Sequence, residues 1–213
     1  MLQSRLLSSV PGLVHGFTTV EHSDDFTRIA AEAGCLGAAR AHQVHGAEVL
    51  LATSAGPMEE GDAVLTSTPG VLAAVRVADC VPVLLAAPGA VCAVHAGWRG
   101  TVQSIVVRAL ERLCEHAGCS AKDVHVAIGP SISLASYEVG QEVLDAVRAV
   151  TDAPVIRGRH VDLKGTNAAL LHAHGVTAID ILPHDTFTDR RLHSYRRSGA
   201  DAGRQVGFIG LSP

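Results

Sequence analysis

Short apolar runs separated by glycine and proline dominate the first half of the chain. They are rich in Val, Leu and Ala and lie at residues 12–18, 47–52, 62–66, 71–77, 81–87 and 90–95. Runs of this length between turn signals are typical of buried β-strands. Pro88-Gly89 stands between the last two runs and predicts a hairpin turn. The stretch 54–62 contains Gly, Pro and acidic residues and predicts a loop.

Apolar positions with helical spacing follow in the second half. Between 101 and 118 they fall at 102, 105, 106, 109, 110 and 113, and Gly118 is a plausible terminator. The segments 138–150 and 162–175 also predict amphipathic helices, whereas 124–129, 176–182 and 205–211 predict strands. This mixture predicts an α/β (α+β) fold with mixed β-sheets flanked by helices, as one domain over residues 1–213.

Composition narrows the class of protein. The 213 residues are 47% hydrophobic and 18% charged, with a formal net charge of −4. A general nucleic-acid binder carries a basic excess, which this chain lacks. No apolar run reaches the roughly 20 residues that span a bilayer. The five cysteines form an odd set and the first residues lack the apolar core of a signal peptide, so we expect free thiols and a cytoplasmic location.

Two reactive residues flank the predicted hairpin. Cys80 precedes its first strand and His95 ends its second. A thiol and an imidazole in this arrangement fit three interpretations: a nucleophile with its base, two ligands of a zinc ion, or a buried cysteine and a structural histidine. Spacing alone favours the structural interpretation, because free cysteines are usually buried and inert.

A second pair of histidines stands at 42 and 45, in the stretch HQVHG. One of them would complete a set of one Cys and two His. Three protein ligands with an open fourth position are the pattern of a catalytic zinc site. The alternative is a polar loop before the strand at 47–52, and the spacing does not choose between His42 and His45.

Two further segments carry arginines. Trp98 and Arg99 lie between glycines just before the helix expected from Thr101, where unpaired backbone N–H groups and a guanidinium would hold an anion such as phosphate. Trp98 would then stack on a ring of the ligand. In the structural alternative, Trp98 packs in the core and Arg99 is a surface residue that caps the helix. Arg196 lies in SYRRSGADAGRQ, a basic loop suited to phosphate or ribose oxygens, with a solvated surface loop as the alternative.

Several of these stretches together resemble one family. HQVHGAEV, ADCVPVLL, VHAGWRGTV, IGPSIS with SYEVG, and SYRRSG with GR are similar, in this order, to the signatures of the YfiH-type laccase-domain family. Its members are described both as polyphenol oxidoreductases and as purine nucleoside phosphorylases. The resemblance extends from about Pro11 to the end of the chain.

The resemblance implies a site and an activity. It implies a metal, usually zinc, bound by His45, Cys80 and His95, and so selects His45 over His42. It also implies phosphorolysis of purine nucleosides such as adenosine, inosine, guanosine and methylthioadenosine, with deamination of adenosine in some members. Arg99, Trp98 and Arg196 are the candidates for binding substrate and phosphate. Copper-dependent oxidation of phenols is one alternative activity. A Cys–His hydrolase that uses Cys80 and His95 is another. We expect a monomer or a homodimer.

The chain departs from the family pattern at two places. The usual N-terminal Ser-Thr-Arg is replaced by the segment Thr18-Thr19-Val20-Glu21, which lacks the arginine. Near the C-terminus, His184-Asp185-Thr186 stands where the family has Cys-Thr. These departures are compatible with weak phosphorolysis, with a different substrate, or with a larger share of the phosphate binding for Arg99 and Arg196. His184 is a candidate replacement polar group at the pocket.

Overall fold

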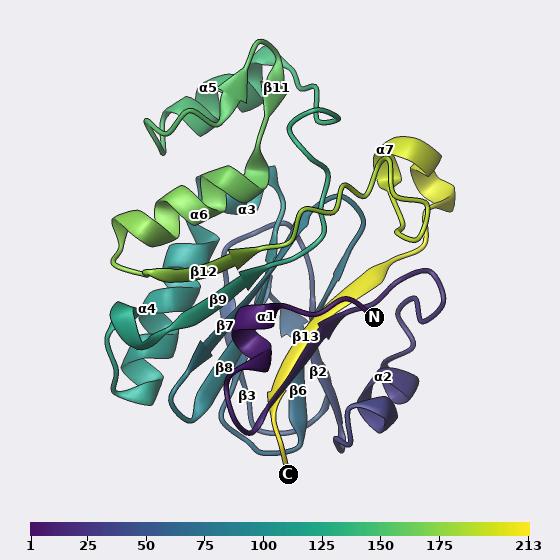
Figure 1. Cartoon of the computed structure of the whole chain (residues 1–213), viewed down its shortest axis with the longest axis vertical. Coiled ribbons are helices and arrows are strands. Elements are labelled where there is room, and N and C mark those ends of the chain that lie inside the picture. The colour runs from purple at the N-terminus through teal and green to yellow at the C-terminus, as the bar shows by residue number, and fades with distance from the viewer.

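Two β-sheets packed face to face form the centre of the molecule (Figure 1). The computed structural model describes all residues from 1 to 213. The first sheet has five strands in the order β1-β13-β6-β2-β4, which are Leu13–Phe17, Gln205–Leu211, Val71–Val77, Gly37–His42 and Gly56–Glu60. The second has six strands in the order β12-β9-β7-β8-β5-β3, which are Ala178–Ile181, His125–Ile128, Val81–Ala87, Ala90–Ala96, Ala63–Thr66 and Val49–Ala52.

Helices cover the outer faces of both sheets. Those longer than one turn are α2 (Phe26–Glu32), α3 (Trp98–Val102), α4 (Ile105–Ala117), α5 (Gln141–Arg148) and α6 (Leu163–Ala173). The helices α4 and α6 pack on the six-stranded sheet, and α2 packs on the five-stranded sheet (Figure 1). Short elements complete the chain: α1 (Arg5–Ser8), α7 (Tyr195–Ser198), the 3-10 turns Ala121–Asp123 and Gly199–Asp201, and the hairpin of β10 (Ile156–Arg157) and β11 (His160–Val161).

The predicted fold class is confirmed. Both sheets are mixed, since β2 runs parallel to β6 while β13 runs antiparallel to it, and β12 runs parallel to β9 while β7 runs antiparallel to it. All the predicted strands are present, with ends within two residues of those expected. The turn at Pro88-Gly89 closes the β7–β8 hairpin, in which Ala87 pairs with Ala90. No helix is both long and apolar enough to cross a membrane.

Burial on both faces explains the apolar runs of the central hairpin. In β7, Val81, Val83 and Leu85 face the helices, whereas Leu84 and Ala86 face the other sheet. A strand that is covered on both sides has no polar face, so its sequence does not alternate. In β8 the face toward the other sheet carries Val91, Ala93 and then His95, because side chains alternate along a strand. The His95 imidazole therefore lies at the end of the layer between the sheets.

Two expectations of secondary structure were wrong. The segment 101–118 forms two helices, α3 and α4, separated at Ser104, whose φ of 60° is left-handed. The helix that follows His95 therefore begins at Trp98 and not near Thr101. The segment 54–62 contains β4, which pairs in parallel with β2. Neither β2 nor β4 contains a β-branched residue, so local propensity gave no signal for them.

Candidate metal centre

Three side chains from distant parts of the sequence meet at one end of the two sheets. They belong to His45, Cys80 and His95, and their ligand atoms all lie within 4.8 Å of one another. The two imidazole rings stand nearly perpendicular, with centroids 4.8 Å apart. His95 is only 3% exposed, Cys80 is half-buried, and His45 is open to solvent. His42 ends β2 on an exposed position and is not part of the cluster.

The hairpin register brings Cys80 and His95 together. Val81 pairs with Ala96 and Pro82 pairs with His95, so Cys80, one residue before the strand, lies opposite Gly97. A Cβ built on Gly97 would lie 3.1 Å from Cys80 Sγ and 3.1 Å from His45 Cδ2. These contacts are tighter than most Cβ atoms make, so a side chain at position 97 would push against the thiol and the imidazole, and Gly97 avoids this crowding.

Asp62 organises the cluster and was not singled out from the sequence. Its side chain is 0% exposed, and its carboxylate accepts hydrogen bonds from the backbone N–H groups of Val44, His45 and Gly46 at 3.2, 3.0 and 2.6 Å. Its Oδ1 also lies 2.7 Å from Nδ1 of His95. One carboxylate therefore fixes the loop of one candidate ligand and the ring of another.

The Asp62 contact fixes the tautomer of His95. Burial raises the pKa of Asp62, but hydrogen bonds from His95 and Gly46 outweigh it, so the net pKa is lowered and the group is a carboxylate. A carboxylate only accepts, so Nδ1 of His95 donates and Nε2 is left for the cluster. A carboxylate behind a histidine is the usual support for a metal-binding imidazole.

Without a metal, Cys80 and His95 form an ion pair. Burial raises the pKa of the Cys80 thiol, but the charge of His95 and hydrogen bonds from both histidines lower it to about 6. Burial lowers the pKa of His95, but the Cys80 thiolate and the hydrogen bond with Asp62 raise it to about 9. A nucleophilic or metal-binding thiolate is therefore present at neutral pH.

The cluster lies in the wall of a pocket of about 800 Å³. The rest of the wall includes two aromatic residues, Tyr137 and Tyr195, and three arginines, Arg76, Arg196 and Arg204. Burial, with the negative charge of Cys80, raises the pKa of Tyr137 to about 12, so its hydroxyl stays protonated. The pocket therefore joins a candidate metal centre to aromatic surface and positive charge, which suits an anionic or ring-containing small molecule.

Comparison with known proteins places this arrangement in a family. Residues 19–212 match the family model described as multi-copper polyphenol oxidoreductase laccase. The chain belongs to this family. Among solved structures, the laccase-domain fold is shared with YlmD from Geobacillus stearothermophilus, with a TM-score of 0.83 and 28% identity over 95% of this chain and 93% of that one. Bacillus licheniformis YfiH gives a TM-score of 0.76 and 26% identity over 82% of this chain and 74% of that one.

Relatives of this laccase-domain chain carry two kinds of enzyme name. A Deinococcus radiodurans protein named purine nucleoside phosphorylase is 38% identical over 92% of this chain and 82% of its own length. A Bacteroides thetaiotaomicron protein of the same name is 41% identical over 70% of this chain and 60% of its own length. A protein named adenosine deaminase RL5, from an unknown prokaryotic organism, is 36% identical over 72% of this chain and 63% of its own length.

The other predicted binding residues of this family member lie at different distances from the pocket. Arg196 is part of the pocket wall; its guanidinium donates to Glu138 O at 3.0 Å and lies 5.3 Å from the Tyr137 ring centroid. Arg99 is exposed and stacks on Trp98, with 4.4 Å between the guanidinium carbon and the ring centroid. Trp98 packs against the helix-facing core. Neither Trp98 nor Arg99 belongs to the pocket wall.

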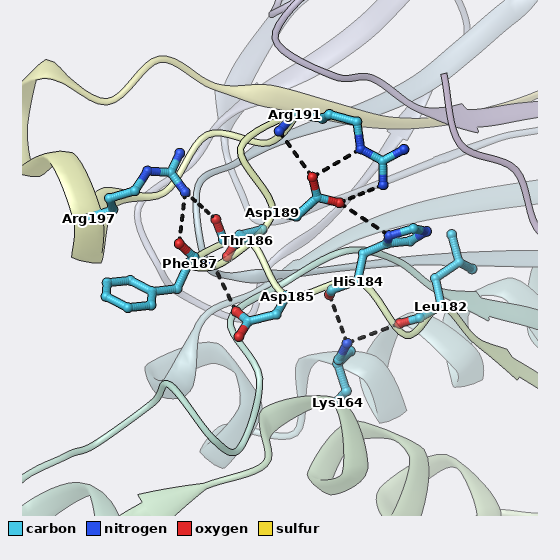
Figure 2. Close-up of polar contacts among 9 residues, drawn as sticks. All are labelled: Lys164, Leu182, His184, Asp185, Thr186, Phe187, Asp189, Arg191 and Arg197. Atoms are coloured by element: carbon cyan, nitrogen blue, oxygen red, sulfur yellow. Dashed lines mark hydrogen bonds and ion pairs between the residues drawn. The ribbon is translucent and has the colours of Figure 1, made fainter.

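The loop after β12 does not place His184 in the pocket wall. The His184 ring pairs with Asp189 at 3.4 Å, and its carbonyl accepts from the buried Lys164 at 3.1 Å (Figure 2). His184 is absent from the pocket wall, so the expectation that it replaces a polar group there was wrong. Asp185 instead ties this loop to Ser133 and Ser136, with Oδ2 2.8 and 2.6 Å from their hydroxyls.

Proposed function

We propose that this chain cleaves purine nucleosides with inorganic phosphate at the His45–Cys80–His95 cluster. The observation that carries the proposal is the juxtaposition of this cluster with a pocket that also contains arginines and tyrosines. The names of the Deinococcus and Bacteroides relatives support the reaction class. Adenosine, inosine, guanosine and methylthioadenosine are the proposed substrates.

Zinc is the proposed metal, with His45, Cys80 and His95 as its ligands. One thiolate and two imidazoles suit zinc, and the Asp62 contact leaves His95 Nε2 free for it. A zinc ion held by these three residues would supply Lewis acidity at the pocket. Copper remains the alternative, since the family description names it. The structure has one such cluster, whereas oxidation by several coppers needs more ligand sets.

The chain's own residues supply binding and proton control. Phosphorolysis forms a bond between a phosphate oxygen and the sugar carbon and breaks the bond to the purine nitrogen, which takes the electron pair and a proton. We assign the phosphate to Arg196, with Arg204 as a second positive group on the pocket wall. We assign the purine to the aromatic residues, where the protonated Tyr137 hydroxyl is available as a donor. Arg99 and Trp98 stay predicted contributors from just outside the wall.

Deamination of adenosine is the second candidate activity. It is favoured by the relative named adenosine deaminase and would use the same pocket. A Cys–His hydrolase is the third, and the lowered pKa of Cys80 is its supporting observation. In each case the ligand is a small molecule. We also propose a cytoplasmic location, a monomer or homodimer, and no role in binding nucleic acid, consistent with the formal net charge of −4.

One experiment separates these activities. The purified protein is analysed for bound zinc and copper and incubated with adenosine or inosine, with and without phosphate. Phosphorolysis yields free base and ribose 1-phosphate only when phosphate is present; hydrolysis yields free ribose, and deamination yields inosine from adenosine. Cys80→Ala should abolish both metal and activity, whereas Cys35→Ser, outside the cluster, should retain both. No turnover by the zinc-loaded protein would refute the proposal.

A further inference from the structure

The Asp79 carboxylate links two segments of the pocket wall that are distant in the sequence. Asp79 immediately precedes Cys80, and its side chain reaches across to the C-terminal part of the chain. Its Oδ1 accepts from Thr186 Oγ1 at 2.5 Å, and its Oδ2 accepts from the backbone N–H of Arg196 at 2.6 Å. Asp79 is 9% exposed and Thr186 is 0% exposed, so the contact between them is buried, whereas the contact with Arg196 is partly buried. Hydrogen bonds to a buried charged group are stronger than those at the surface.

The backbone at Asp79 has an unusual conformation and makes a further hydrogen bond. Its φ of 84° lies in the left-handed region, which non-glycine residues rarely adopt. The Asp79 carbonyl also accepts from the N–H of Ile132 at 3.1 Å, so the loop after β9 is tied to the same residue. Ile132 and Arg196 are both part of the pocket wall.

The Asp79 contact fixes the start of α7. Ser194 caps this helix by accepting from the N–H of Arg197, and Asp79 accepts from the N–H of Arg196 beside it. Four residues form only about one turn, which is not stable by itself. The position of the Arg196 backbone, from which its side chain extends into the pocket wall, therefore depends on the Asp79 carboxylate.

Thr186 is itself held from two sides. Its N–H donates to Ser131 O at 3.1 Å. Its carbonyl accepts from Arg197 Nη1 at 2.7 Å, and Figure 2 shows this contact. Thr186 thus presents its hydroxyl to Asp79 from a fixed position. A rigid donor leaves the carboxylate a single orientation toward Arg196.

We propose that Asp79 is a positioning residue that holds the Arg196 guanidinium at the distance from the His45–Cys80–His95 cluster at which phosphate binds. Its carboxylate acts on the N-terminal turn of α7, and the Thr186 hydroxyl fixes the orientation of that carboxylate. The inference rests on the proposed function, because it takes inorganic phosphate as the ligand of Arg196. It predicts that the carboxylate controls phosphate affinity more than metal affinity.

The test measures the binding of inorganic phosphate to the zinc-loaded protein by calorimetry, alongside zinc content. Asp79→Asn keeps a residue type that tolerates a left-handed backbone, but its amide places a donor against one of the two donors. We expect the phosphate Kd to rise about tenfold with zinc content unchanged. Thr186→Val removes the hydroxyl and should raise the phosphate Kd by the same factor. Thr186→Ser keeps the hydroxyl and should keep the wild-type phosphate Kd. Asp145 is an exposed residue of α5, and Asp145→Asn should leave the phosphate Kd unchanged.

The outcomes are distinct. The inference is overturned if the phosphate Kd of Asp79→Asn equals that of the wild type. It is also overturned if Asp79→Asn loses zinc together with phosphate binding, or if the wild type binds no phosphate. If the wild type binds phosphate but does not cleave nucleosides, the proposed function fails while the inference is still judged by the phosphate Kd. If nucleosides are cleaved, the KM for phosphate should rise in Asp79→Asn with little change in kcat.

Discussion

Nδ1 of His95 lies 2.7 Å from Oδ1 of Asp62, and both side chains are buried. The same carboxylate accepts from the backbone around His45. Asp62 therefore couples the orientation of one candidate ligand to the loop of another. The contact between His95 and Asp62 is buried, so water screens it less than it screens the exposed ion pairs elsewhere on the chain.

Replacing Asp62 with Asn should weaken the metal centre. The amide offers one acceptor in place of two and directs a donor at groups that themselves donate. We expect the zinc Kd to rise roughly 10- to 100-fold, and the free energy of unfolding to fall by about 2 kcal/mol. Competition with a chromophoric chelator measures the first and denaturant unfolding the second. Equal zinc affinity in Asp62→Asn and wild type would show that Asp62 only holds the loop.

Replacing Gly97 with Ala should displace the ligands. The new methyl group would lie 3.1 Å from both Cys80 Sγ and His45 Cδ2. Gly140→Ala is a matched control, since both glycines precede a helix with φ near −75° and nothing lies within 4 Å of a Cβ at Gly140. We expect Gly97→Ala to bind zinc about tenfold more weakly than Gly140→Ala at similar stability. Two equal affinities would contradict the crowding inferred at Gly97.

Zinc binding to the metal-free chain should depend on pH. Between the Cys80 pKa of about 6 and the His95 pKa of about 9, the thiolate is ready but the imidazolium must lose a proton before it can bind. We expect the affinity to rise about tenfold per pH unit from pH 7 to 9 and to level off above that range. Chelator competition across this range is the measurement. A flat profile would show that His95 binds no metal.

Alkylation should distinguish a metal ligand from a free nucleophile. In the metal-free chain, Cys80 should react with iodoacetamide at a rate that rises through about pH 6. Cys114 should stay slow, because burial and the neighbouring Cys119 raise its pKa to about 11. Zinc should protect Cys80, as measured by mass spectrometry of the peptides. Equally rapid modification of Cys80 with zinc bound would favour the Cys–His hydrolase.

The central strands were predictable from the sequence, because strands that are buried on both faces consist of continuous apolar runs. The strands β6, β7 and β8 were predicted to within one residue, since each is covered on both faces. By contrast, β2 reads GAARAH and was missed. Its place between β6 and β4 comes from pairing partners that are distant in the sequence. Local propensity does not record such pairing.

The same division applies to the candidate site. Residue type and family resemblance selected His45, Cys80 and His95, because thiol and imidazole groups are the ligands that zinc prefers. Asp62 gave no comparable signal, because a single carboxylate beside a strand usually caps a turn. The position of Asp79 next to Cys80 was compatible with two roles, a group that orients a ligand or a turn cap. Only the packing of β5 on β8, and of the C-terminal loop on the hairpin, turned Asp62 into the support of His95 and Asp79 into the anchor of Arg196. Hydrogen-bond partners more than 30 residues apart are set by tertiary contacts, which no local pattern encodes.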